Sequence, residues 1–149
     1  MYDTILIPTD GSATAERALN DGLDIARRYG ATVHALSVID VAELLEVDYL
    51  GDRSDFEATI EPLEDEAKRA VSTVEEYARQ LDDVEVITVV REGDPYETIV
   101  AYADDVDADL IVMGTHGRRG LPRYLLGSTT ERVIRTVDVP VMAVRTPEE

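Results

Sequence analysis

The sequence contains no cysteine and only two histidines among its 149 residues. The absence of cysteine excludes disulfide bonds, thiolate metal centres and thiol catalysis. Because His34 and His116 are the only imidazoles, a site built from several histidines is excluded as well. No apolar run approaches the roughly 20 residues of a membrane-spanning helix. The opening stretch has an acid at Asp3 and no basic segment, which is not typical of a signal peptide. We therefore expect a cytoplasmic protein.

Lysine is almost absent too, since Lys68 is the only one. Aspartate and glutamate number 32 against 14 lysines and arginines, which gives a net charge of −18. Yet 44% of the residues are hydrophobic, so the composition is not that of a disordered chain. An acidic, lysine-poor, foldable chain suggests adaptation to a salt-rich cytoplasm, as in a halophile; an ordinary acidic protein is the alternative. This charge disfavours nucleic acid and anionic membranes as partners.

Five apolar, β-branched runs predict strands, and several are near-continuous, which is typical of strands buried on both faces of a parallel sheet. The runs are Thr4–Pro8, Thr32–Val38, Val84–Val90, Asp109–Met113 and Val139–Val144. Helical spacing of apolar residues predicts four helices between them. These are Ala15–Tyr29 (ended by Gly30), Leu63–Leu81, one beginning at Asp94, and Ser128 to about Arg135. Asp94 with Glu97, and Ser128 with Glu131, have the spacing of capping boxes.

Strands alternating with helices predict a single doubly wound α/β domain over residues 1–149, with a five-stranded parallel sheet and helices on both faces. The segment Asp40–Glu66 is the exception, with eleven acids and one base. We interpret it as a long surface loop with a short helical turn near Val41–Leu45. Pro62 would then stand near the first turn of the following helix.

In such a sheet, ligands bind at the carboxyl ends of the strands, where the strand order reverses. If the order is 3-2-1-4-5, the segment after strand 1, Thr9–Ser12, faces the segment after strand 4, Gly114–Thr130. Gly114 and Gly117 would let the backbone turn and approach a ligand closely. Gly127 and Ser128 lead into a helix whose N terminus suits an anion.

This second segment is neither a Walker A loop nor a G-x-G-x-x-G dinucleotide fingerprint. Residues 114–135 contain five arginines and one acid, which favours an anionic ligand there. The alternative is a flexible loop in which Ser128 only caps the helix.

Asp10 could accept hydrogen bonds from a ribose or hold Mg²⁺ near phosphates. Its alternative role is to cap the first helix, which Ser12 could do equally well. The backbone of Val38 could read an adenine edge, although Val38 and Met113 could equally be ordinary core residues.

The basic and imidazole side chains near this segment differ in what we expect of them. His116 is expected to shape the loop or to contact phosphate. Arg118 could contact phosphates, whereas Arg119 is expected to be a surface residue. His34 lies within a predicted strand and is expected to be packed there rather than to act as a ligand.

The chain resembles the universal stress protein family along nearly its whole length. The resemblance rests on the opening ILIPTDGS, on DVPVMAV near the end, and on the spacing G-x2-G-x9-G-S at Gly114, Gly117, Gly127 and Ser128. It implies the strand order 3-2-1-4-5, a homodimer paired through the last strand, and ATP binding. Asp10 would touch ribose or a metal, Val38 would hold adenine, and the glycines with Ser128 and Thr130 would surround the phosphates.

The residues and the resemblance together give one set of candidate nucleotide-binding residues, with Asp10 also a candidate Mg²⁺ ligand. The set is Pro8, Thr9, Asp10, Val38, Met113, Gly114, His116, Gly117, Arg118, Gly127, Ser128, Thr129 and Thr130. The leading hypothesis is an ATP-binding regulatory protein of the stress response, acting as a homodimeric nucleotide-dependent switch. The alternatives are a slow ATPase or nucleotidyl-transfer enzyme and a nucleotide-free dimeric adaptor. The lack of an evident strong general base argues against fast chemistry.

Overall fold

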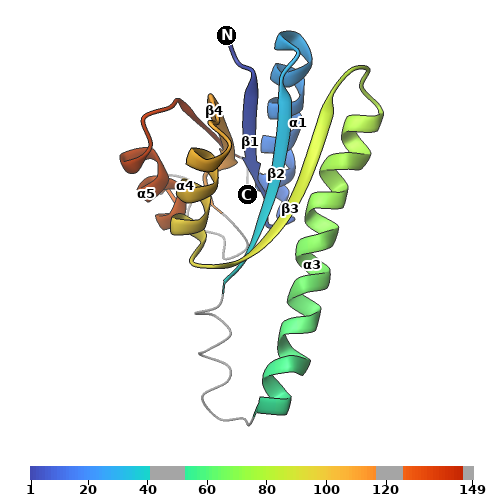
Figure 1. The fold of residues 1–149 in the computed structure, drawn as a ribbon, viewed down its shortest axis with the longest axis vertical. Coiled ribbons are helices and arrows are strands. Elements are labelled where there is room, and N and C mark those ends of the chain that lie inside the picture. Colours follow the sequence, from blue (N-terminus) through green and yellow to red (C-terminus); the bar gives the residue numbers. More distant parts are fainter. Residues whose placement is uncertain (41–52, 117–125, 146–149) are drawn as a thin grey trace.

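Five parallel strands form one sheet in the order β3-β2-β1-β4-β5 (Figure 1), which confirms the predicted order. The structure is a computed structural model that describes residues 1–40, 53–116 and 126–145. The strands are β1 (Thr4–Pro8), β2 (Thr32–Asp40), β3 (Glu85–Gly93), β4 (Leu110–Gly114) and β5 (Val141–Val144). β2 and β3 continue further than predicted because their pairing extends to Asp40 and Gly93.

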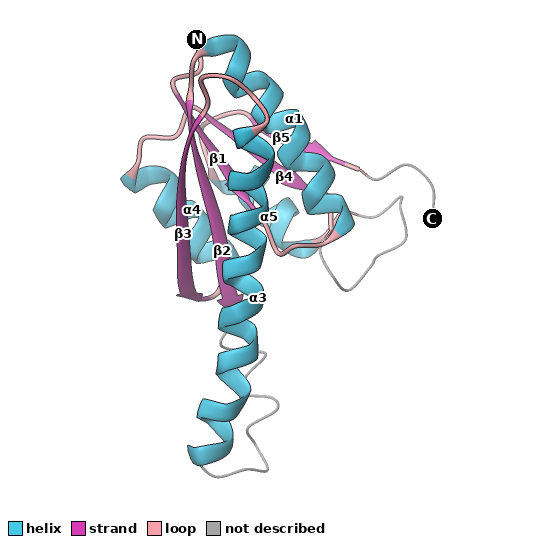
Figure 2. Cartoon of the chain, turned by 90° about the vertical axis from the view of Figure 1, so that its right-hand side faces the viewer, coloured by secondary structure: helices cyan, strands magenta, loops and turns pink. Residues whose placement is uncertain are grey.

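In the described part of the chain, four helices cover the two faces of this sheet, and a helix was predicted at each of these places. They are α1 (Ala13–Tyr29), α3 (Arg53–Arg79), α4 (Pro95–Asp105) and α5 (Ser128–Thr136). α1 and α3 lie on one face, and α4 and α5 lie on the other (Figures 1 and 2). In the part of the chain that is described, no helix is both long enough and apolar enough to span a membrane.

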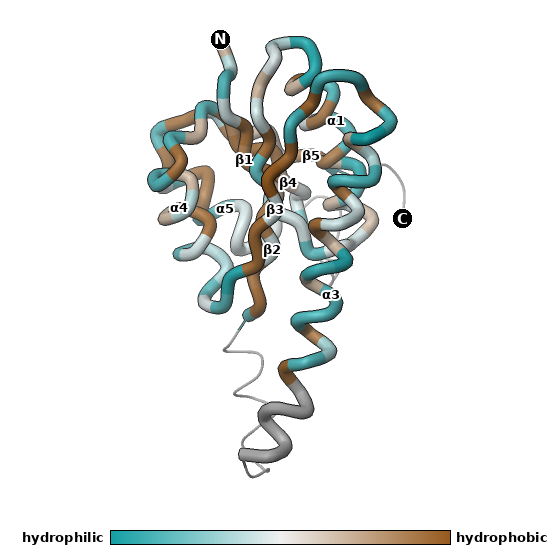
Figure 3. Tube along the Cα trace, turned by 45° about the vertical axis from the view of Figure 1, so that its right-hand side comes forward, coloured by the Kyte–Doolittle hydropathy of each residue, from teal (hydrophilic) through white to brown (hydrophobic). Residues whose placement is uncertain are grey.

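Successive strand residues supply the two halves of the core. Ile5 and Ile7 pack with α1 and α3, whereas Leu6 between them packs with α4 and α5. All three are fully buried, and the hydrophobic residues follow the strands through the centre of the molecule (Figure 3). Near-continuous apolar strands were the signal for this arrangement, because both faces of a parallel sheet are covered.

The prediction of a loop over Asp40–Glu66 was wrong in part. Its second half belongs to α3, which begins at Arg53 and extends past the ends of the strands (Figure 1). Pro62 therefore lies inside the helix rather than near its first turn. An acidic composition does not prevent a helix, because glutamate is a good helix former and tertiary packing outweighs one proline. Leu63 and Ile60 pack against Ile39 at the end of β2. The helical turn predicted at 41–45 lies outside the described residues.

The predicted helix caps have different outcomes. Asp94 accepts a hydrogen bond from the Glu97 backbone N–H at 2.9 Å and caps α4 as expected. Gly30 ends α1 in the left-handed conformation with φ 67°, also as expected. The capping box at Ser128 was wrong, because the cap position of α5 is Gly127 and Ser128 is already the first helical residue.

Candidate functional site

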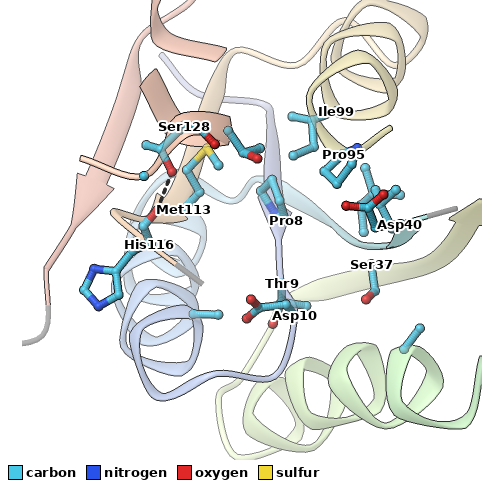
Figure 4. A pocket seen from close by; sticks show the side chains of 18 of the residues that line it. Pro8, Thr9, Asp10, Ser37, Asp40, Pro95, Ile99, Met113, His116 and Ser128 are labelled. Atoms are coloured by element: carbon cyan, nitrogen blue, oxygen red, sulfur yellow. Dashed lines mark hydrogen bonds between the residues drawn. The ribbon is translucent and has the colours of Figure 1, made fainter. Parts of the chain in front are cut away.

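A cavity of about 630 Å³ lies at the carboxyl ends of β1, β2 and β4 (Figure 4), within the usual size of small-molecule sites. Its wall also includes residues of α3 and the first turns of α4 and α5. All predicted site residues that the structure describes line this cavity. They are Pro8, Thr9, Asp10, Val38, Met113, Gly114, His116, Gly127, Ser128, Thr129 and Thr130. Gly117 and Arg118 lie outside the described residues.

Hydrogen bonds join the end of β4 to the start of α5. The Thr130 hydroxyl donates to the Gly114 carbonyl oxygen at 2.8 Å, and the Gly127 N–H donates to the Thr115 carbonyl oxygen at 2.6 Å. A Cβ at Gly127 would lie 2.8 Å from that same Thr115 oxygen. The two ends of the intervening segment are therefore clamped together, and the clamp requires glycine at position 127.

Gly114 also serves packing. A Cβ there would lie 2.7 Å from the Thr14 Cγ2 atom and 3.2 Å from the Thr14 carbonyl carbon. The space that a side chain would occupy is thus taken by the first turn of α1. Glycine at position 114 is therefore required for packing against α1, in addition to the expected role of letting a ligand approach closely.

Ser12, rather than Asp10, caps α1. The Ser12 hydroxyl accepts from the Ala15 N–H at 3.2 Å and caps α1. Asp10 instead accepts from the Ser12 N–H at 2.9 Å through its Oδ1 atom, which forms a tight turn. Half-buried at the cavity wall, the Asp10 carboxylate is positioned by this turn rather than by a helix (Figure 4).

The two histidines have different surroundings. The His116 ring is turned toward α1, with its Nε2 atom 3.4 Å from the Thr14 hydroxyl and its Nδ1 atom 3.2 Å from the Thr115 hydroxyl (Figure 4). His34 packs on the other face, where its Nδ1 atom lies 2.7 Å from the Tyr102 hydroxyl. Burial lowers the pKa of His34, against the opposing effect of Glu85. His34 is therefore a packed strand residue, as expected.

The arginine argument from the sequence holds only in part. Arg132 stacks over the Tyr96 ring at 4.0 Å, and Arg135 forms an ion pair with Glu131 at 2.8 Å, so neither lines the cavity. Arg118, Arg119 and Arg123 lie outside the described residues. Among the described residues of the lining there is no lysine or arginine.

Carboxylates are instead the charged groups of the described lining. They come from four elements or their ends, and are Asp10, Asp40, Glu66 and Glu131. No group of three or more potential metal ligands occurs within the described ranges. Among the described residues, a metal ion would therefore find separate carboxylates and no preformed cluster of ligands.

Sequence reasoning missed the part of the wall that α3 and the end of β2 provide. The missed residues include Ser37, Ile39, Asp40, Leu63, Glu66, Ala67, Pro95 and Ile99. Leu63, Glu66 and Ala67 have the i, i+3, i+4 spacing of one helix face, which was the available signal. These residues were predicted to be helical, but the sequence alone does not place this helix beside the end of β2.

Comparisons with known proteins agree with this fold. Residues 1–145 match the universal stress protein family. Universal stress protein MJ0531 of Methanocaldococcus jannaschii is 38% identical over 149 residues, which cover 100% of this chain and 85% of that protein. The solved structure of protein MJ0577 from the same organism has a TM-score of 0.85 at 34% identity, covering 100% of this chain and 99% of that one.

A third similar protein carries a ligand. The universal stress protein from Archaeoglobus fulgidus in complex with dAMP has a TM-score of 0.64 at 27% identity, covering 96% of this chain and 98% of that one. The family match and the relatives span nearly the whole chain, and the observed strand order is the one that the resemblance implied. This chain therefore belongs to the universal stress protein family.

Proposed function

We propose that this protein binds ATP in the cavity at the strand ends and acts in the stress response as a nucleotide-dependent regulator. The observation that carries the proposal is the N terminus of α5, which opens on the cavity without a capping side chain. α1 is capped by Ser12 and α4 by Asp94, whereas the cap position of α5 is a glycine. A phosphate group could accept hydrogen bonds from the first N–H groups of α5 and would also be favoured by the helix dipole.

The opposite end of the cavity suits the base. The apolar side chains of Ile39 on β2 and Leu63 on α3 pack together there, and Ile99 of α4 also lines the cavity. Such a surface can pack against a flat heterocycle, with polar groups at the edges to orient it. In this proposal the Val38 backbone faces adenine, and Asp10, between the two ends, faces ribose.

The charge of the lining favours binding of the nucleotide with a cation. Glu131 is paired with Arg135, but Asp10 would repel a bare triphosphate, and the described lining itself supplies no lysine or arginine. Mg²⁺ commonly binds through one or two carboxylates together with substrate phosphates. Asp10 is the residue that we assign to Mg²⁺, with the remaining ligands coming from phosphate oxygens and water.

The dAMP complex of the Archaeoglobus fulgidus protein supports an adenine nucleotide as the ligand class. The assignment of ATP rests on the uncapped N terminus of α5 in the cavity wall, together with the glycine and serine spacing that resembles the ATP-binding members of the family.

A homodimer forms the second part of the proposal. β5 lies at the edge of the sheet, and Met142 on β5 and Ile134 on α5 are 39% and 42% exposed. An exposed apolar edge invites pairing with another chain, and two identical edges can pair about a two-fold axis. Since β4 joins both β5 and α5, ATP at α5 could alter the paired edge and so act as a switch.

Calorimetric titration of ATP, with and without Mg²⁺, tests the site. Ser128→Asp places a negative charge in the first turn of α5, where it stabilises the helix but repels phosphate. We expect higher thermal stability and weaker ATP binding in this variant, while Ser128→Asn, of similar shape and no charge, keeps both near the original values. Equal affinity in the Asp and Asn variants would contradict phosphate binding at α5.

The assignment of Asp10 to Mg²⁺ is tested by comparing ATP binding with and without the metal ion. Asp10→Asn should weaken binding of ATP in the presence of Mg²⁺ more than in its absence, since the amide is a poorer ligand for a hard cation. Asp21→Asn, at an exposed position of α1, is the matched control for the loss of one charge. Phosphate release measured in the same samples distinguishes a regulator from a slow ATPase.

A further inference from the structure

Ser37 is a buried polar residue in the cavity wall. It lies near the end of β2, opposite Val90 of β3, and is only 3% exposed. Its hydroxyl lies at the cavity and projects from β2 toward α3 (Figure 4). Within residues 1–40, 53–116 and 126–145, no hydrogen bond is formed by this hydroxyl, whereas the neighbouring Thr9 hydroxyl accepts one from the Gly11 N–H at 3.2 Å.

A buried hydroxyl without a partner is costly, because it has lost its hydrogen bonds to water without replacing them. Such groups are few in folded proteins, and each calls for an explanation. Packing alone gives none here, because alanine would fill nearly the same space without the polar atom. A hydrogen-bonding group of a ligand in the cavity would satisfy it.

The position of Ser37 indicates which part of the ligand this is. β2 and β4 lie on opposite sides of β1, so Ser37 and the N terminus of α5 belong to opposite sides of the cavity (Figure 4). Asp40 and Glu66, which line the same side as Ser37, would repel a phosphate there. The apolar surroundings of Ser37 suit a heterocycle instead.

We propose that the Ser37 hydroxyl donates a hydrogen bond to a ring nitrogen of the bound purine, and that Ser37 is thereby a specificity-determining residue of this protein. Purine ring nitrogens without hydrogen are acceptors, and a serine hydroxyl rotates to suit its acceptor. The inference rests on the proposed nucleotide site and adds a side-chain contact to the base.

The test compares Ser37→Ala with Ser72→Ala, a matched loss of a hydroxyl from an exposed position on α3 outside the cavity. Titration with ATP should show about two- to tenfold weaker binding for Ser37→Ala, the usual effect of one lost hydrogen bond. Ser72→Ala should bind ATP unchanged. Thermal unfolding without nucleotide should show Ser37→Ala as stable as the original protein or more so, because the unpaired hydroxyl is gone.

Analogues of ATP identify the contact. With 1-deaza-, 3-deaza- and 7-deaza-ATP, the original protein should lose affinity for the one that lacks the accepting nitrogen, and Ser37→Ala should show no such additional loss. That coupling is not expected of a residue that only supports the fold.

Three results would overturn the inference. The first is an unchanged ATP affinity in Ser37→Ala, while the original protein binds ATP; the proposed function would then stand without this contact. The second is weaker binding with no coupling to any of the three analogues, or with a fall in thermal stability that accounts for it. The third is an original protein that does not bind ATP, which removes the proposed function and this inference together.

Discussion

The hydroxyl of Thr130 donates a hydrogen bond of 2.8 Å to the carbonyl oxygen of Gly114, 16 residues earlier in the chain. Thr130 is only 3% exposed, and the bond itself is part-buried at the cavity wall. It ties the first turn of α5 to the last residue of β4 and so holds two walls of the cavity in a fixed relation. Thr130 thus shapes the site, because its hydroxyl already donates its one hydrogen to Gly114.

Thr130→Val should lower the free energy of unfolding by about 0.5–1.5 kcal/mol, because it removes the donor to the part-buried Gly114 carbonyl oxygen. Thr130→Ser keeps the hydroxyl and should cost less. Urea unfolding of both variants gives the comparison. Equal losses would mean that the methyl group, rather than the hydrogen bond, is what stabilises this junction.

Gly114→Ala should destabilise the fold by about 1–3 kcal/mol, as overpacking generally does. The added Cβ would meet the Thr14 Cγ2 atom at 2.7 Å, and the Thr14 backbone stands close behind it. Thr14→Ser removes that Cγ2 atom and should recover part of the loss in the double variant. If the double variant loses as much free energy of unfolding as the two single variants added together, the packing explanation is contradicted.

Stability should depend on pH through His34. Burial lowers the pKa of His34 in the folded state, so the unfolded chain binds a proton first as the pH falls. The free energy of unfolding should therefore fall as the pH drops below about 6.5, the value for an exposed histidine, and level off below the folded pKa.

His34→Gln can still pair with the Tyr102 hydroxyl but cannot titrate. The difference in stability between the original protein and this variant, measured by urea unfolding from neutral to mildly acidic pH, isolates His34 from the many carboxylates. A difference that stays constant with pH would contradict the lowered pKa.

Salt should stabilise the protein. At −18, carboxylates repel one another over much of the surface, and screening shortens the reach of that repulsion to about 3 Å at 1 M salt. We expect the thermal midpoint to rise between low and molar potassium chloride. A midpoint that is flat or falls would count against adaptation to a salt-rich cytoplasm.

The proposed dimer predicts a defined effect at the sheet edge. Lysine at Val141 and Ala143 together should release monomers, because two charges would face their symmetry copies across the paired β5 strands. The control is Asn20→Lys with Gln80→Lys, which changes the charge equally at exposed positions of α1 and of the turn after α3. This control should remain dimeric. Sedimentation velocity reports the mass of each. A monomeric original protein would rule out the dimer.

The two-faced core could be predicted because it depends on local patterns, whereas the strand order was implied by the resemblance to the universal stress protein family. Continuous apolar strands such as Thr4–Pro8 are stable only when both faces are covered, and a helix between each pair of strands supplies that cover. Gly30 and Asp94 marked helix ends through backbone chemistry that a single residue decides. Motif spacing then predicted the residues of β1, β4 and α5 that line the cavity.

The tertiary structure alone decided what depends on contacts between distant segments. α3 brings Glu66 to the end of β2, because Ile60, Leu63 and Ala67 pack there against Ile39. The helix begins at Arg53 and continues through the proline and the acidic residues that favoured a loop. Gly114 at the end of β4 packs against Thr14 in the first turn of α1, a contact that no local pattern encodes. The unpaired hydroxyl of Ser37 likewise has no signal in the sequence, since a serine reveals its missing partner only when every neighbour in space is known.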